Sequence, residues 1–101
     1  MGNESFGNYI RRLRMERNLP LRKVAAQLDI DTSTLSKVER GDRPFSIKYL
    51  EPLSQVLEIN LKEIQTKFVA DTINNEYGKL EFLEDGLREA QSLYLKLKNT
   101  K

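Results

Sequence analysis

Short or flexible hydrogen-bonding side chains gather in the middle of the chain with helical spacing. They are Thr32, Ser33, Ser36 and Lys37. In a helix these spacings place them on one face, because residues three and four apart are neighbours. A face of such groups without bulky apolar side chains suits the major groove of DNA, which is about 12 Å wide and presents base edges. A polar face is also commonly plain solvated surface, so its surroundings must decide.

Basic side chains flank this polar face on both sides. Arg22 and Lys23 precede it, and Arg40 and Arg43 follow it. These positions lie near the expected helix ends, where the phosphates of a bound duplex would pass. The chain as a whole has a formal net charge of only +2. The positive excess is concentrated in residues 1–45, which favours an anionic partner for that part.

A second basic cluster is expected on the first helix. It consists of Arg11, Arg12, Arg14 and Arg17. With the exception of Arg14, these arginines are interpreted as a solvated helix face rather than as a track for phosphates.

Composition excludes several other chemistries. The 101-residue chain has no His and no Cys, which removes His/Cys zinc sites, thiolate nucleophiles and imidazole catalysis. Disulfides are impossible, so a reducing, cytoplasmic compartment is expected. There is no apolar run of about 18 residues that could span a membrane. Carboxylates such as Glu84 and Asp85 lack converging partners, so we expect no enzyme, no metal and no cofactor.

Apolar residues recur at helical spacing through most of the chain, and no segment alternates with period two, which predicts an all-α fold. Helices are expected over residues 5–17, 21–28, 32–40, 46–57, 60–73 and much of 80–98. Asp31, Ser46 and Asn60 are expected to cap three of these helices, and Gly41 to end the third. Residues 74–78 are expected to separate the last two helices.

Residues 21–40 have the pattern of a helix-turn-helix, in which two short helices are joined by a turn of three or four residues. Ala25 is small where the two helices cross, and Ile30 is expected to fill the space between them. Asp29 has to tolerate a positive φ, which it does less readily than glycine. Leu35 and Val38 are expected to anchor the second helix from behind, while its polar face stays open.

The segment LRKVAAQLDIDTSTLSKVERGDRP closely resembles the lambda-repressor-like, XRE-type (Cro/C1-type) helix-turn-helix proteins of bacteria and phages. The resemblance runs from about Phe6 to Ile64 and is sharpest in the run SKVERG. It implies a five-helix DNA-binding domain in a transcription regulator that is usually dimeric. We therefore expect a DNA-binding domain in residues 1–66 and a C-terminal helical extension in residues 67–101.

The resemblance also implies roles for individual residues. Those matching Thr32, Ser33, Ser36 and Lys37 contact bases, and those matching Arg40 and Arg43 touch the DNA backbone. The residue matching Glu39 pairs with a basic residue of the first helix, here Arg14, so this pair is expected to be structural.

The chain departs from the family pattern at the start of the second helix and in the turn. Pro20 and Leu21 replace a polar cap and a phosphate-binding Gln, so Arg22 or Lys23 would have to supply that contact. Asp29 replaces the glycine of the turn and adds a negative charge beside the proposed DNA face.

An apolar stripe follows in the extension, in steps of three and four residues. Its members are Leu80, Leu83, Leu87, Ala90, Tyr94 and Leu97. Such a stripe is too apolar to face water, so it is expected to pack on the domain or on a second chain.

Together these observations predict a sequence-specific regulator that binds double-stranded DNA as a homodimer on a palindromic operator, without a cofactor. Two alternatives stay open. One is an antitoxin-type or other protein-interaction module, in which the apolar stripe holds a protein partner such as a toxin. The other is a controller protein of a restriction–modification operon.

Overall fold

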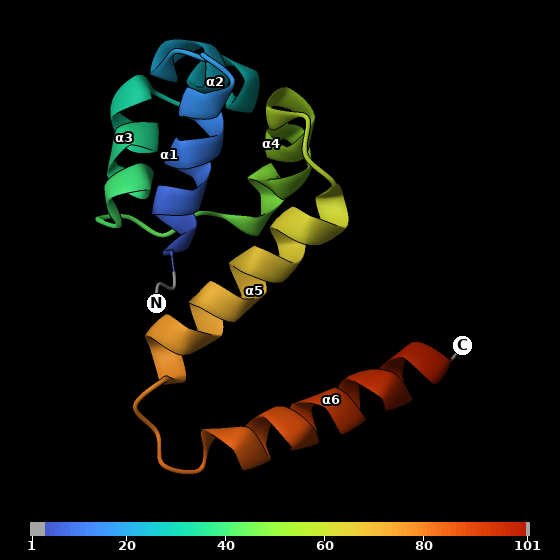
Figure 1. Ribbon diagram of the computed structural model, residues 1–101. Helices are drawn as coiled ribbons and strands as arrows, with labels where there is room; N and C mark the ends of the chain where they lie inside the picture. Colours follow the sequence, from blue (N-terminus) through green and yellow to red (C-terminus); the bar gives the residue numbers. More distant parts are fainter. Residues whose placement is uncertain (1–3, 101) are drawn as a thin grey trace. The chain divides into compact units, whose positions relative to one another are not determined.

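A computed structural model describes residues 4–100, and this part of the chain consists of helices, turns and loops without a strand (Figure 1). The elements are α1 (Phe6–Glu16), α2 (Leu21–Leu28), α3 (Thr32–Arg40), the 3-10 helix η1 (Ile47–Tyr49), α4 (Leu50–Leu57), α5 (Leu61–Tyr77) and α6 (Leu83–Asn99). The predicted all-α fold is therefore confirmed. The chain forms two compact units, Met1–Asp71 and Thr72–Lys101, which we call unit 1 and unit 2.

Unit 1 is held together by one apolar core. Ile10, Leu35, Leu53, Leu57 and Ile64 are completely buried, and they come from α1, α3, α4 and α5. Within this core α2 packs against α3 and α4, and α1 packs against α3. Burying each such side chain contributes about 1.5–3 kcal/mol. The core therefore fixes how α3 is held.

Aromatic rings extend this core to one end of α1. The ring of Phe6 lies 5.5 Å from that of Phe45 and 5.2 Å from that of Phe68, measured between ring centroids. The second contact is edge-to-face, an arrangement that the ring quadrupoles favour. These contacts tie the loop after α3 and the first part of α5 to α1.

The first turn of α1 approaches α3 so closely that only glycine fits there. A Cβ atom on Gly7 would lie 2.5 Å from the carbonyl oxygen of Val38 and 2.6 Å from that of Glu39. Both neighbours are backbone atoms and cannot turn away as the end of a side chain could. Gly7 thus sets the distance between α1 and α3.

Several helix ends use a residue in the left-handed conformation. Gly41 has φ of 83° after α3, as expected, and Asp29 has φ of 57° after α2. Asn18 and Glu58 adopt the same conformation, each with φ of 54°. Asn tolerates this region through its short polar side chain, whereas Glu58 has no such local advantage.

Three expectations about helix ends are wrong. Asp31 and Ser46 stand at N-cap positions, but neither side chain makes a capping hydrogen bond. The α-helix expected from residue 46 instead starts at Leu50, after η1. Pro52 explains this start, because a longer helix would place the proline in its interior, where its missing N–H breaks the hydrogen-bond ladder. In the first turn of α4 that N–H is not needed.

The expected break at residues 74–78 is also wrong in part, since α5 continues to Tyr77 and only Gly78 lies beyond it. Asparagine lowers helix propensity by well under about 1 kcal/mol, which does not stop a helix that is already formed. The last helix begins at Leu83 rather than near Leu80. By contrast, Asn60 caps α5 as predicted, because its Oδ1 accepts from the backbone N–H of Lys62 at 2.8 Å.

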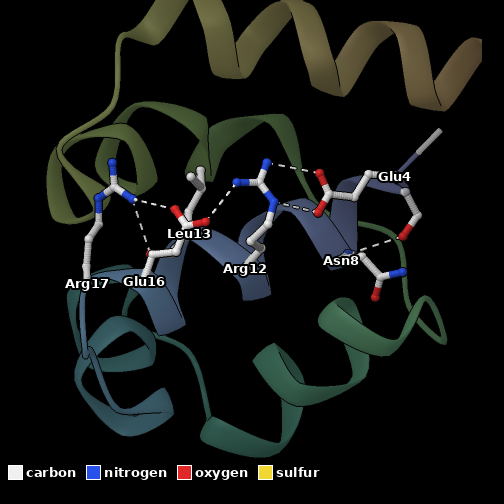
Figure 2. A network of polar contacts seen from close by, with 7 residues as sticks. Glu4, Asn8, Arg12, Leu13, Glu16 and Arg17 are labelled. Atoms are coloured by element: carbon white, nitrogen blue, oxygen red, sulfur yellow. Dashed lines mark hydrogen bonds and ion pairs between the residues drawn. The ribbon is translucent and has the colours of Figure 1, made fainter. Parts of the chain in front are cut away.

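Two arginines on the solvent side of this region, Arg12 of α1 and Arg17 just after it, are paired with carboxylates (Figure 2). Arg12 donates from Nε to Glu4 at 2.7 Å and from a terminal nitrogen to Glu16 at 3.1 Å. Arg17 lies 3.8 Å from Glu16. The hydrogen bond from Arg12 holds the pKa of Glu4 below its usual value. This arrangement fits the interpretation of the cluster as solvated surface.

We predict that Gly7→Ala destabilises unit 1 by about 1–3 kcal/mol, because the new methyl group forces α1 and α3 apart. Urea unfolding followed by circular dichroism measures the change. The exposed neighbour Asn8 provides the control, since Asn8→Ala should stay within about 0.5 kcal/mol of the parent. Equal stability of the two variants would contradict the close packing of α1 on α3.

Candidate nucleic-acid interface

The turn between α2 and α3 has a closed hydrogen-bond pattern. The N–H of Asp29 donates to the carbonyl of Ala26 at 3.1 Å, and that of Ile30 donates to the carbonyl of Ala25 at 3.0 Å. This pattern ends α2 with a left-handed residue and turns the chain sharply. Ala25 is buried where α2 meets its neighbours, and Ile30 packs against the core. The turn therefore sets the direction in which α3 leaves.

The two faces of α3 differ sharply. Leu35, Val38 and Glu39 are buried on the inner side. On the outer side Thr32, Ser33, Lys37 and Arg40 are exposed, and Ser36 is half-buried. The structure therefore brings the four predicted base-contacting residues together on one face, with hydrogen-bonding groups turned away from the core of unit 1.

An ion pair ties the inner face of α3 to α1. The guanidinium of Arg14 donates to both carboxylate oxygens of Glu39, from Nε at 2.8 Å and from a terminal nitrogen at 3.1 Å. The other terminal nitrogen donates to the carbonyl of Leu19 at 2.9 Å. The side chains are 13% and 5% exposed, so the pair is nearly dry. Two parallel hydrogen bonds fix orientation as well as distance.

Arg40 is engaged on the outer face of α3 itself. One terminal nitrogen donates to Oγ of Ser36 at 2.7 Å, and Nε donates to Asp42 at 3.2 Å. Because Oγ of Ser36 accepts this bond, its own O–H is left to donate elsewhere. Sequence reasoning assigned Arg40 to a phosphate and did not consider Asp42. The spacing of two residues across Gly41 was the available signal.

The other predicted phosphate contacts are exposed. Arg22 and Lys23 lie in the first turn of α2, and Arg43 lies in the loop after Gly41. Arg43 lines a hollow between the helix-turn-helix and that loop, together with the exposed carboxylates of Asp29 and Asp31. These two acids reduce the positive potential beside the start of α3.

The part of the chain that the structure describes shows neither a metal site nor a membrane-spanning helix. Within residues 4–100 no group of three or more His, Cys, Asp or Glu side chains is placed to hold a metal ion. Among the helices of that same stretch, none is both long and apolar enough to cross a membrane.

The apolar stripe of unit 2 lies largely at the surface. Leu87, Tyr94 and Leu97 are 41%, 58% and 74% exposed. Leu80 and Ala90 are also exposed, and Leu83 is half-buried. Within unit 2 itself, the stripe therefore has no apolar cover over most of its length.

Comparison with known proteins assigns the chain to a family. A family model described as helix-turn-helix matches residues 10–64, more than half of the chain. The chain therefore belongs to this family, the XRE-type helix-turn-helix proteins, which are DNA-binding transcription regulators. This match confirms the predicted family and the lambda-repressor-like fold.

One similar protein is the control protein C.MunI of a Mycoplasma species. It is 40% identical over 60 residues, which make up 58% of this chain and 81% of that protein. The family match ends at residue 64, so unit 2 lies wholly outside it.

We predict that Glu39→Ala lowers the free energy of unfolding by about 3 kcal/mol, because it leaves a nearly dry guanidinium without its carboxylate. Chemical unfolding monitored by circular dichroism tests this value. Glu16→Ala is the matched control, since it removes an exposed partner of Arg12 and should change stability by less than about 1 kcal/mol. Losses of similar size would show that the Arg14–Glu39 pair does not hold α3.

Proposed function

We propose that unit 1 binds double-stranded DNA in a sequence-specific manner by placing the outer face of α3 in the major groove. The observation that carries this proposal is the contrast between the two faces of α3. Its inner face is fixed by Leu35, Val38 and the Arg14–Glu39 pair, while its outer face presents polar groups to solvent. Membership of a DNA-binding regulator family supports the same function.

The base-contacting residues in this proposal are Thr32, Ser33, Ser36 and Lys37. Ser36 acts as a donor, because Arg40 already occupies an acceptor site on its hydroxyl. Lys37 can only donate, since an ammonium group has no acceptor. Both side chains can therefore donate to acceptors in the major groove, and the two adjacent acceptors N7 and O6 of guanine suit them best.

Phosphate contacts supply most of the affinity in this proposal. Arg22, Lys23, Arg40 and Arg43 are the residues that make them, and all four are exposed. Binding should then weaken steeply as salt rises, because each neutralised phosphate releases counterions. Arg40 would leave Asp42 for a phosphate when DNA arrives.

Two copies acting together would read a palindromic operator. A two-fold dimer of helix-turn-helix units places its recognition helices about 34 Å apart, one turn of DNA. We assign DNA reading to residues 1–66 and assembly to residues 67–101. The dimer acts in the cytoplasm and needs no cofactor.

A second candidate function concerns which genes the protein controls rather than how it binds DNA. The similar Mycoplasma protein is named as a control protein. This name favours a controller of a restriction–modification operon over an antitoxin whose unit 2 holds a toxin. Purification from native cells separates the two, because a stoichiometric protein partner would favour the antitoxin.

Selection of bound duplexes from a random pool at stated salt tests the proposed function and should enrich an inverted repeat.

On that operator Lys37→Ala should lose about 1–3 kcal/mol of binding free energy and relax the preference at one base pair, with little change in its affinity for random DNA. Lys62→Ala, which removes an exposed lysine of α5, is the control and should change neither affinity. Equal weakening on operator and random DNA would overturn the base contact of Lys37.

Asp42 should restrain DNA binding, because its carboxylate competes with phosphate for Arg40. Asp42→Asn is expected to tighten binding to operator and random DNA alike by several-fold. It should also steepen the dependence of log K on log salt by up to about one unit. Fluorescence anisotropy over a salt series measures both, with Asp85→Asn in unit 2 as the control. Weaker binding by Asp42→Asn would mean that Asp42 instead positions Arg40 for DNA.

A further inference from the structure

The apolar stripe of α6 has the spacing of a coiled-coil seam. Its members inside the helix are Leu83, Leu87, Ala90, Tyr94 and Leu97. Their separations alternate between four and three residues, which is the repeat that lets two helices pack along a common line. None of these side chains is buried, and the helix is continuous from Leu83 to Asn99.

Charge is distributed unevenly along the same helix. The first half holds Glu84, Asp85 and Glu89 against one cation, Arg88. Arg88 is already paired with the two nearest acids, at 3.7 Å from Glu84 and 3.0 Å from Asp85. The second half holds Lys96 and Lys98 and no acid. The helix is therefore acidic at its start and basic at its end.

We propose that α6 pairs with α6 of a second copy of this chain in an antiparallel manner. A parallel pair would bring the acidic halves together and the basic halves together. An antiparallel pair sets each acidic half beside a basic half, and it also aligns the two helix dipoles favourably. The partner with the complementary pattern is thus the chain itself.

Residue spacing specifies the register of this pair. Glu84 and Lys98 are each seven residues from Gln91, so all three lie on the same side of the seam. A two-fold axis near Gln91 brings Glu84 to the height of the partner's Lys98, and Lys98 to the height of the partner's Glu84. In this register Ala90 lies about 3 Å along the helix axis from the partner's Tyr94, because that pair is centred on residue 92, and its small side chain makes room for the large ring.

This inference rests on the proposed homodimer and names its interface, but it does not depend on DNA binding. Association of the full-length chain is therefore measured without DNA, by sedimentation equilibrium. Failure here would leave the reading of DNA by α3 untouched, and failure of DNA selection would leave this association untouched.

Charge reversal tests the direction of pairing. Glu84→Lys and Lys98→Glu should each raise the dimer dissociation constant by about tenfold, since each replaces two attractive contacts of the symmetric pair by two repulsive ones. The double variant with both changes should return close to the parent value. Glu89→Lys, on the outer side of α6, makes the same charge change away from the seam and should have little effect.

The alternative explanations predict different results. Each charge reversal could instead act only by destabilising the end of α6 on which it lies. The double variant would then associate less well than either single variant, and the proposal is overturned. A parallel pair predicts no change from either reversal, because like charges already face one another there. A parent chain that is monomeric at all concentrations, with the stripe covered by its own unit 1 or by another protein, also overturns the proposal.

A cross-linking measurement gives an independent check of orientation. The chain has no cysteine, so one introduced thiol is unique. Gln91→Cys should join two copies through a bis-maleimide with a span of about 10 Å, because it lies near the two-fold axis. Glu84→Cys should not, since fourteen residues of helix separate the two sites by about 21 Å along the axis. Equal cross-linking of both variants would contradict the antiparallel pair.

Discussion

The bidentate pair between Arg14 and Glu39 is the interaction on which the orientation of α3 depends. It joins α1 to α3 from inside the unit, and its guanidinium also binds the carbonyl of Leu19 just before α2. The side chain of Arg14 thus connects α1 to α3 and to the loop that leads into α2. Its net contribution to stability is smaller than its geometry suggests, because burying two charges costs solvation free energy. Its main effect is to fix the angle of α3.

Other features of unit 1 help to keep α3 buried on one side and exposed on the other. Gly7 allows α1 to approach α3, and the left-handed Asp29 turns the chain from α2 into α3. The outer face carries donors that are already partly organised, since Ser36 and Arg40 are bonded to one another. The acids at positions 29, 31 and 42 oppose the basic residues around them. In the proposed complex these acids would hold the affinity for DNA below its maximum, which would favour discrimination between operator and random DNA.

Much of the fold could be predicted from the sequence because its information is local. The apolar spacing of α2 and α3, the turn between them and Gly41 after them all lie within about twenty residues. Arg14 and Glu39 are 25 residues apart, and only the family resemblance suggested their pairing. The start of α4 follows from Pro52, because a proline fits the first turn of a helix but not its interior. The continuation of α5 through Asn74 could not be predicted in the same way, since asparagine and a short polar run are compatible with both helix and loop.

Side-chain pairings on the surface were the least predictable part of the candidate site. Arg40 could bind phosphate, Asp42 or Ser36 with equal chemical sense. The helical spacing of α3 brings Ser36 within its reach, and the turn at Gly41 brings Asp42 there. The apolar stripe of α6 posed the opposite problem. Its spacing was evident, but its partner depends on charges spread over the whole helix.

In the proposed complex, DNA contacts the outer face of α3. Titration of the isotopically labelled chain with its selected operator, followed by amide chemical shifts in NMR spectra, tests this claim directly. We expect the largest changes in amide chemical shift on residues 32–43 and on the first turn of α2, and only small changes on α6. Large shifts confined to α5 or α6, with α3 unmoved, would contradict it.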